Sequence, residues 1–153
     1  MQDIMSEEAI VGLVSAAISA VVSWIVAKLT IERNDKSALD NELSEILKIG
    51  IEHPYLEQTR FTTSWKPELG ENDDRYATYD LYATLVFNHL EKVCKFHRFR
   101  YDKIQEDIDM QSWVKTHETY WKNPIQAHEN ILGYDLRFLE LIDKKILKKG
   151  KAG

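Results

Sequence analysis

One stretch decides the fold: residues 7–36, which read EEAIVGLVSAAISAVVSWIVAKLTIERNDK. Within it, Ala9 to Ala27 form a run of nineteen residues without a charged side chain. At a rise of 1.5 Å per residue, a helix of this length spans about 28 Å, close to the roughly 30 Å hydrocarbon thickness of a bilayer. The run therefore predicts a transmembrane helix over residues 9–29.

Two other interpretations of the run are a secretion signal and a buried core helix. A secretion signal starts with basic residues and has a shorter apolar segment, whereas this chain starts with Asp3, Glu7 and Glu8 and has no Lys or Arg before the run. A buried helix of this length is unusual in a chain of 153 residues. The sequence favours the membrane span over both.

The flanking charges predict the orientation of the span. Lys28, Arg33 and Lys36 follow it, and no Lys or Arg precedes it. Because basic flanks stay on the cytoplasmic side, we expect a single-pass protein of the cell (inner) membrane. Residues 1–8 would lie outside the cell and the remainder of the chain in the cytoplasm. The single Cys94 suits that reducing compartment.

Small residues recur along the span at four-residue spacing. Such faces let helix backbones approach closely in lipid, where van der Waals contacts and hydrogen bonds drive association. One series is Gly12, Ala16 and Ala20, and the other is Ser15, Ser19, Ser23 and Ala27. We expect the span to form a homo-oligomer through these faces. A small pore lined by the serine series is the alternative.

The remaining chain is long enough for one compact domain. We divide it into a polar juxtamembrane connector (residues 30–38), a cytoplasmic helical domain (residues 39–149) and a tail (residues 150–153). Strand patterns are nearly absent, so the sequence predicts an all-α fold, a small irregular helical bundle. The net charge of −5 gives no argument for nucleic acid as a partner.

The first helix of this domain is expected from the spacing of Leu39, Leu43, Ile46 and Leu47, and Pro54 ends it. The membrane helix either runs straight into this element or breaks near Asn34. The next segment, TTSWKPELGENDD (residues 62–74), is predicted to be a loop, in which Asp73 or Asp74 caps the following helix.

Three further helices are predicted. The clearest begins at the Asp73–Asp74 cap, and its apolar face comprises Tyr79, Tyr82, Ala83, Val86, Leu90, Val93 and Cys94. A third starts near Asp109, with a stripe of Met110, Trp113, Val114, His117, Tyr120 and Trp121. Asn123 and Pro124 mark another possible helix start. The last helix starts near Asp135 and presents Leu136, Leu139, Ile142, Ile146 and Leu147.

A metal site is the first chemical hypothesis, because His89, Cys94 and His97 include a Cys-x-x-His spacing that zinc can use. On a helix, however, His89 and Cys94 project about 140° apart, so we interpret these residues as structural. The sequence contains no glycine-rich phosphate loop, HExxH pair or nucleophile elbow. We therefore predict neither catalysis nor a cofactor.

Basic and aromatic residues alternate in EKVCKFHRFRYDK (residues 91–103), and more lysines follow near the C-terminus. The candidate residues for contact with lipid or another anion are Lys92, Lys95, Arg98, Arg100, Lys103, Lys148 and Lys149. Anionic lipid is near at hand for a tethered domain, and nucleic acid is a second candidate. The plain alternative is a solvated, charged end of two helices.

The order of aromatic and apolar positions in IEHPYLE (residues 51–57), YDLYATLVFNHLEKV (79–93), MQSWVKTHETYWKN (110–123) and FLELIDKKI (138–146) carries a resemblance. With the N-terminal span, it resembles small bacterial membrane-anchored helical proteins that carry a domain of unknown function. The resemblance implies a membrane-tethered all-α domain, and it implies no activity or site residues.

These observations support three hypotheses of function. The first is a non-enzymatic, membrane-anchored interaction or regulatory protein that binds a protein partner or itself; bacterial stress and phage-defence modules often pair a span with a sensor domain in this way. The second is a membrane-perturbing or pore-forming effector that acts through an oligomer of the span. The third is an enzyme whose site is assembled from residues distant in the sequence.

Overall fold

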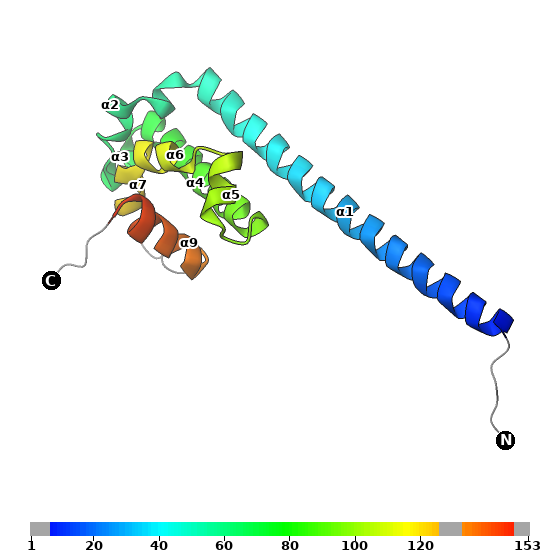
Figure 1. Cartoon of the computed structure of the whole chain (residues 1–153). Coiled ribbons are helices and arrows are strands. Elements are labelled where there is room, and N and C mark those ends of the chain that lie inside the picture. Colours follow the sequence, from blue (N-terminus) through cyan, green and yellow to red (C-terminus); the bar gives the residue numbers. More distant parts are fainter. Residues whose placement is uncertain (1–6, 126–132, 149–153) are drawn as a thin grey trace. The chain divides into compact units, whose positions relative to one another are not determined.

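Every regular element in the described part of the chain is helical, which confirms the all-α class for those residues (Figure 1). The computed structural model describes residues 7–125 and 133–148. Contacts between residues divide the chain into two units, Met1–Ala38 and Leu39–Gly153. The first unit holds the long apolar part of helix α1 (Glu7–Glu52), and the second holds the other helices.

Helix α1 runs without a break through the connector, so of the two alternatives the continuous helix is correct and the break near Asn34 is not observed. The physical reason is that residues 28–38 contain neither proline nor glycine. The helix ends at Glu52, two residues before Pro54, as predicted. His53 has left the helical region, with φ −127° and ψ 68°.

The domain end of α1 buries two of its four predicted apolar positions. Leu39 and Ile46 are buried, and Leu43 is half-buried. Leu47, the fourth residue of this spacing, is exposed. It lies about 100° around the helix from Ile46, which turns it away from the face that is covered.

Residues 62–74 were predicted to be a loop, and this prediction is wrong for residues 67–72, which form a helix. Over residues 54–72 the chain forms the short helices η1 (Pro54–Glu57), α2 (Thr59–Thr62) and α3 (Pro67–Asn72). Proline is favoured in a first helical turn, so Pro67 starts α3 instead of preventing a helix. Gly70 lies inside α3, and the Trp65 ring packs so close to it that a Cβ atom there would come within 2.9 Å of the ring. A residue with a side chain would therefore clash at this position.

Helix α4 (Asp74–Phe96) buries the whole apolar face expected from the sequence, which confirms that prediction. Asp73 is its N-cap, and the side chain accepts a hydrogen bond from the backbone N–H of Arg75 at 2.9 Å. Phe87, which the predicted face omitted, is also fully buried. It widens the buried stripe toward α7 (Glu118–Lys122), where its ring lies 4.7 Å from that of Trp121.

The predicted third helix is present, but it is divided in two. Helix α6 (Met110–Thr116) starts after Asp109, whose side chain accepts from the backbone N–H of Ser112. His117 then leaves helical geometry with ψ 19°, and α7 follows. The predicted stripe is nevertheless buried, apart from the half-buried Trp113. An unpredicted helix, α5 (Tyr101–Asp107), precedes α6.

The C-terminal helix starts where expected, with Asp135 as the N-cap of α9 (Leu136–Glu140), followed by the π-helical turn η2 (Leu141–Ile146). Leu136, part of the apolar stripe expected from the sequence, is 73% exposed, whereas Phe138, which that stripe omitted, is buried. In the structure Asn123 ends α7. The helix expected after Pro124 falls largely on residues 126–132, outside the described residues.

Candidate functional site

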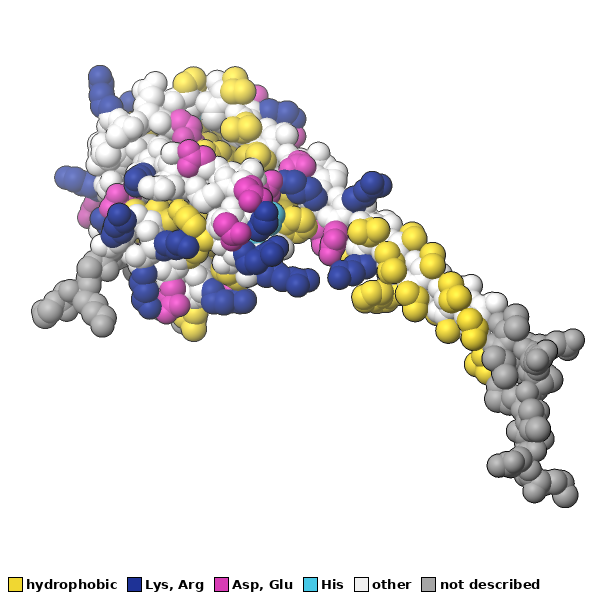
Figure 2. Space-filling view, viewed as in Figure 1, with side chains coloured by type: hydrophobic (Ala, Val, Ile, Leu, Met, Phe, Trp, Pro, Cys, Tyr) yellow, Lys and Arg dark blue, Asp and Glu magenta, His cyan; other side chains and the backbone are white. Residues whose placement is uncertain are grey.

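The apolar part of α1 presents hydrophobic side chains on all sides. From Gly12 to Leu29 every side chain is exposed, including Ile18 at 59% and Trp24 at 66%. Figure 2 shows these apolar side chains along the helix. A helix that is hydrophobic all round is stable only in a large core or in lipid. By length and composition, α1 can cross a membrane near the N-terminus.

The small residues of α1 form one surface instead of two. At about 100° per residue, the glycine–alanine series and the serine series are centred only about 40° apart. Because α1 is continuous, both series lie on adjoining strips of the same helix side. A Cβ atom added at Gly12 would meet nothing within 4 Å. We call Gly12, Ser15, Ala16, Ser19, Ala20 and Ser23 the small-residue surface.

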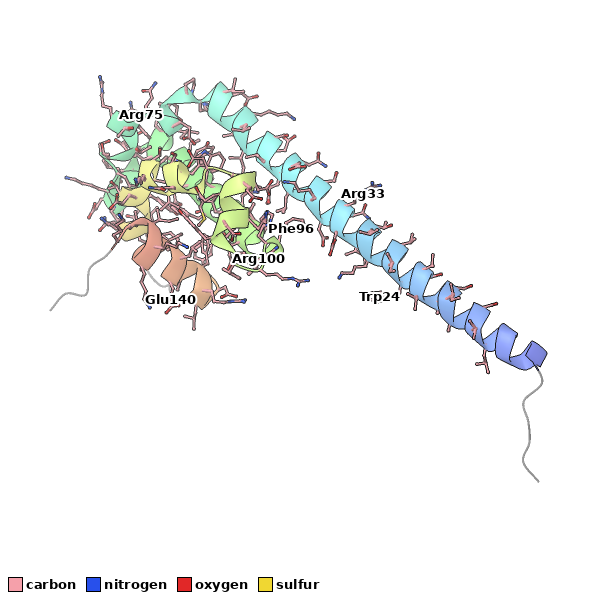
Figure 3. The ribbon with its side chains drawn as sticks, viewed as in Figure 1. Trp24, Arg33, Arg75, Phe96, Arg100 and Glu140 are labelled. Carbon is pink, nitrogen blue, oxygen red and sulfur yellow. The ribbon has the colours of Figure 1, made fainter. Side chains whose placement is uncertain are left out.

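Trp24 and Lys28 lie at the end of the predicted span, one helical turn apart. The Lys28 ammonium lies 5.5 Å from the centroid of the Trp24 ring, within the range of a cation–π contact. Figure 3 shows Trp24 on the same helix as Arg33, where the charged part of α1 begins. This sequence of an aromatic ring, an ammonium and a guanidinium is typical of a membrane–water boundary.

Within the second unit, the last turns of α1 are joined to α4 by a buried polar contact. Nδ1 of His89 lies 3.1 Å from Oε2 of Glu42, and Lys92 donates a hydrogen bond to the other carboxylate oxygen. His89 is only 1% exposed. Leu39 and Ile46, on the same helix face as Glu42, belong to the hydrophobic core that also contains the buried face of α4. Glu42 adds the direct polar contacts to α4.

A second polar network lies where α1 ends. Oε1 of Glu57 accepts a hydrogen bond from the hydroxyl of Tyr82 and lies 3.3 Å from Nε2 of His117. The other nitrogen of His117, Nδ1, lies 3.0 Å from the Tyr79 hydroxyl. Gly50 completes the site, because a Cβ atom there would lie 3.2 Å from the Tyr82 hydroxyl oxygen. The network thus connects α1, η1, α4 and the α6–α7 junction.

Glu57 makes the stability of this network depend on pH. Burial raises its pKa, but the hydrogen bonds with His117 and Tyr82 together outweigh burial and hold the pKa below the ordinary 4.5. A carboxyl with a lowered folded-state pKa stabilises the fold above its unfolded-state pKa. That contribution is lost as the pH falls through the folded-state value. The domain should therefore lose stability below pH 4.5.

We expect Glu57→Gln to weaken this pH dependence, because the amide does not titrate. Denaturant unfolding of the full-length protein in detergent, followed from about pH 3 to about pH 7, measures the slope. Glu52→Gln, at an exposed position five residues earlier, is the matched control and should keep the dependence of the unmodified chain. An unchanged slope in Glu57→Gln would contradict the assignment.

The candidate lipid-contact residues fall into two groups. Three have carboxylate partners: Lys92 with Glu42, Lys95 with Glu91 at 2.8 Å, and Lys103 with Glu106 at 2.6 Å. Arg98, Arg100 and Lys148 are exposed, and none of them has an ion pair with a residue that the structure describes. Lys149 lies outside the described residues.

The three residues of the zinc hypothesis point to separate partners. His89 contacts Glu42, and Nε2 of His97 lies 3.0 Å from Oδ2 of Asp107. The Cys94 thiol lies 3.8 Å from the sulfur of Met110, and burial raises its pKa to about 12. Within residues 7–125 and 133–148, no three His, Cys, Asp or Glu side chains cluster as metal ligands.

Neither polar network was predicted from the sequence, because the residues that form each network are far apart in the chain. Glu57 and His117 are separated by 60 positions, and Glu42 and His89 by 47. The helical stripes placed Tyr79, Tyr82 and His117 on buried faces. A buried polar side chain needs a hydrogen-bond partner, and that requirement was the one signal available in the sequence.

Comparisons with protein-family models, curated proteins and solved structures found no match.

Proposed function

We propose that the chain is a single-pass membrane protein whose helical domain binds a protein partner or itself in a regulatory, non-enzymatic role. One observation carries the proposal of a membrane anchor: from Gly12 to Ala27, α1 exposes an uncharged and largely apolar surface, with Ser15, Ser19 and Ser23 as its polar side chains. Such a surface is unfavourable in water and favourable in hydrocarbon. The helix is also long enough to span the hydrocarbon and continue into the domain.

The proposed orientation places the N-terminus outside the cell (inner) membrane and residues 39–149, as an irregular helical bundle, in the cytoplasm. Its support is the set of basic residues Lys28, Arg33 and Lys36 after the span, with none before it. Tethering raises the effective concentration of a domain at the membrane, so weak contacts suffice for regulation. A stress-response or phage-defence module is compatible with this arrangement.

We further propose that the small-residue surface holds a homo-oligomer together in the membrane. The expected result is that Gly12→Leu combined with Ala16→Leu weakens self-association about tenfold, because leucine side chains keep the backbones apart. Crosslinking of the full-length protein in native membranes measures this. A Cβ atom at Gly12 would meet nothing within 4 Å, and leucine has a higher helix propensity than glycine, so the substitution should not destabilise the helix itself.

The matched control is Val14→Leu combined with Ile18→Leu. Both residues are exposed, and both lie at least about 160° around the helix from the centre of the Gly12–Ala20 series. The control should crosslink like the unmodified chain. Equal crosslinking by both double variants would contradict association through the small-residue surface.

The second candidate function is a pore-forming effector, favoured by the exposed serines of the same surface. Dye release from vesicles that contain the full-length protein separates the two functions. A serine-lined pore predicts release that Ser15→Ala, Ser19→Ala and Ser23→Ala together reduce, because methyl groups replace the polar lining. An anchor predicts no release from either protein.

A further inference from the structure

The turn between α4 and α5 brings several cations to one surface of the helical domain. The backbone N–H of Phe99 donates to the carbonyl of Cys94 at 2.7 Å, and that of Arg98 donates to Lys95 at 3.0 Å. This pair of bonds is a Schellman motif, in which the residue after the helix cap is left-handed. Arg98 occupies that position with φ 53°, and Phe99 follows with φ 59°.

The geometry of the turn separates apolar from basic side chains. Phe99 is half-buried against the core, whereas Arg98 and Arg100 on either side of it are exposed. Figure 3 labels Arg100 at the α4–α5 junction. The contact between His97 and Asp107 holds the turn against the end of α5. The two guanidinium groups are therefore presented by a turn that is fixed on both sides.

Two cations from the C-terminal elements join them. The guanidinium of Arg137 in α9 lies 4.1 Å from the centroid of the Phe99 ring, and the ammonium of Lys145 in η2 lies 3.9 Å from that of Tyr101. We call Arg98, Arg100, Arg137 and Lys145 the turn surface. Its neighbouring carboxylates include the exposed Asp102, Asp135, which pairs with Arg137, and Asp107, which contacts His97. Glu91 lies there too: it accepts a hydrogen bond from the backbone N–H of Asp135 and pairs with Lys95.

Because Asp135, Asp107 and Glu91 each contact a basic side chain, the positive charge of Arg98, Arg100 and Lys145 exceeds the remaining negative charge of Asp102 at this surface, in a chain of net charge −5. Arg98, Arg100 and Lys145 have no ion pair with a described residue, unlike Lys92, Lys95 and Lys103. Exposed arginines without carboxylate partners can donate two parallel hydrogen bonds to a phosphate or carboxylate. The surface is therefore suited to an anionic ligand.

We propose that the turn surface binds anionic lipid headgroups of the membrane in which α1 is anchored, an inference that rests on the proposed function. Two observations select lipid over nucleic acid. Arg137 and Lys145 each cover one face of an aromatic ring, so Phe99 and Tyr101 have less surface on which bases can stack. The connector of residues 30–38 is helical and only about 14 Å long, so along the chain few residues separate the proposed span from the domain that carries the turn surface.

The test measures amide hydrogen exchange over residues 97–104 of the full-length protein in nanodiscs. One set contains phosphatidylcholine alone, and the other contains about one third phosphatidylserine. Exchange should be about tenfold slower in the anionic nanodiscs, and high salt should remove the difference. Equal exchange in both sets would overturn the proposal.

Arg98→Gln, Arg100→Gln and Lys145→Gln together should abolish the difference between the nanodiscs. The matched control removes three positive charges at other exposed positions, through Lys48→Gln, Lys66→Gln and Lys115→Gln. The control should retain the slower exchange in anionic nanodiscs. Loss of the effect in the control as well would show a general charge effect and overturn the assignment to the turn surface.

Three outcomes separate the possible failures. If an RNA oligonucleotide slows exchange in phosphatidylcholine nanodiscs while anionic lipid has no effect, the surface binds nucleic acid and the proposal is wrong. A chain that does not enter nanodiscs at all refutes the membrane anchor and this inference with it. A chain that enters them without lipid-dependent protection refutes the turn surface alone.

Discussion

Replacing Phe87 by alanine lowers the free energy of unfolding of the helical domain by about 3–5 kcal/mol. The Phe87 side chain is fully buried, and its ring lies 4.7 Å from that of Trp121 and 6.2 Å from that of Tyr120. Its removal leaves a cavity between α4 and α7. Because domains of this size are stabilised by only about 5–15 kcal/mol, a large fraction of the chain should unfold at moderate denaturant concentrations.

Tryptophan fluorescence during urea unfolding of the full-length protein in detergent measures this change. Leu81→Ala is the control, because Leu81 lies on the same helix and is 67% exposed. Its effect should stay within about 0.5 kcal/mol. If the two variants are equally stable, Phe87 is not part of the core.

Replacing Ile18 and Val21 together by arginine prevents insertion of α1 into the membrane. Each guanidinium near the centre of a span is unfavourable by about 2.5–3.5 kcal/mol on insertion scales. The two substitutions together should therefore oppose insertion by about 5–7 kcal/mol. Alkaline extraction of membranes, followed by immunoblotting of the full-length chain, should show the variant in the soluble or aggregated fraction.

The control for this experiment is Ile31→Arg combined with Asn34→Arg. Both residues are exposed and follow the uncharged run on the same helix. Added positive charge there agrees with the proposed orientation, so the control should insert like the unmodified chain. Full insertion of the Ile18→Arg, Val21→Arg variant would contradict a span centred on these residues.

The parts of the fold that could be predicted are those whose signals are local. Pro54 ends α1, Asp73 caps α4, and the helical spacing of Tyr79, Tyr82 and Val86 identifies the buried face. Each of these signals acts within one or two helical turns, so neighbouring residues suffice to recognise it.

The predictions failed where tertiary contacts outweigh local preference. Residues 67–72 contain proline and glycine, yet they form α3, in which Gly70 allows close approach of Trp65. Leu136 has the helical spacing expected of a buried residue, but it is exposed. The buried side of α9 is instead the side that carries Phe138. Which side of a short helix is covered depends on its neighbours in space.

Of the two candidate surfaces, the small-residue surface could be predicted from the sequence and the turn surface could not. The apolar surface of α1 and its small residues are properties of one helix, so the sequence was sufficient to identify them. The turn surface depends on contacts of Phe99 with Arg137 and of Tyr101 with Lys145, which are about 40 residues away in the chain. The i,i+4 pair of Glu91 and Lys95 could be predicted from residues 91–103, whereas Glu42, the partner of Lys92, lies 50 positions away.

The most direct test of the account is the partition of the native full-length chain after gentle lysis without detergent. The apolar surface of α1 predicts that the chain sediments with the membranes, resists alkaline extraction, and is released only by detergent. Recovery of the monomeric chain in the aqueous fraction would contradict the membrane anchor, and the proposals on the small-residue surface and the turn surface would fail with it.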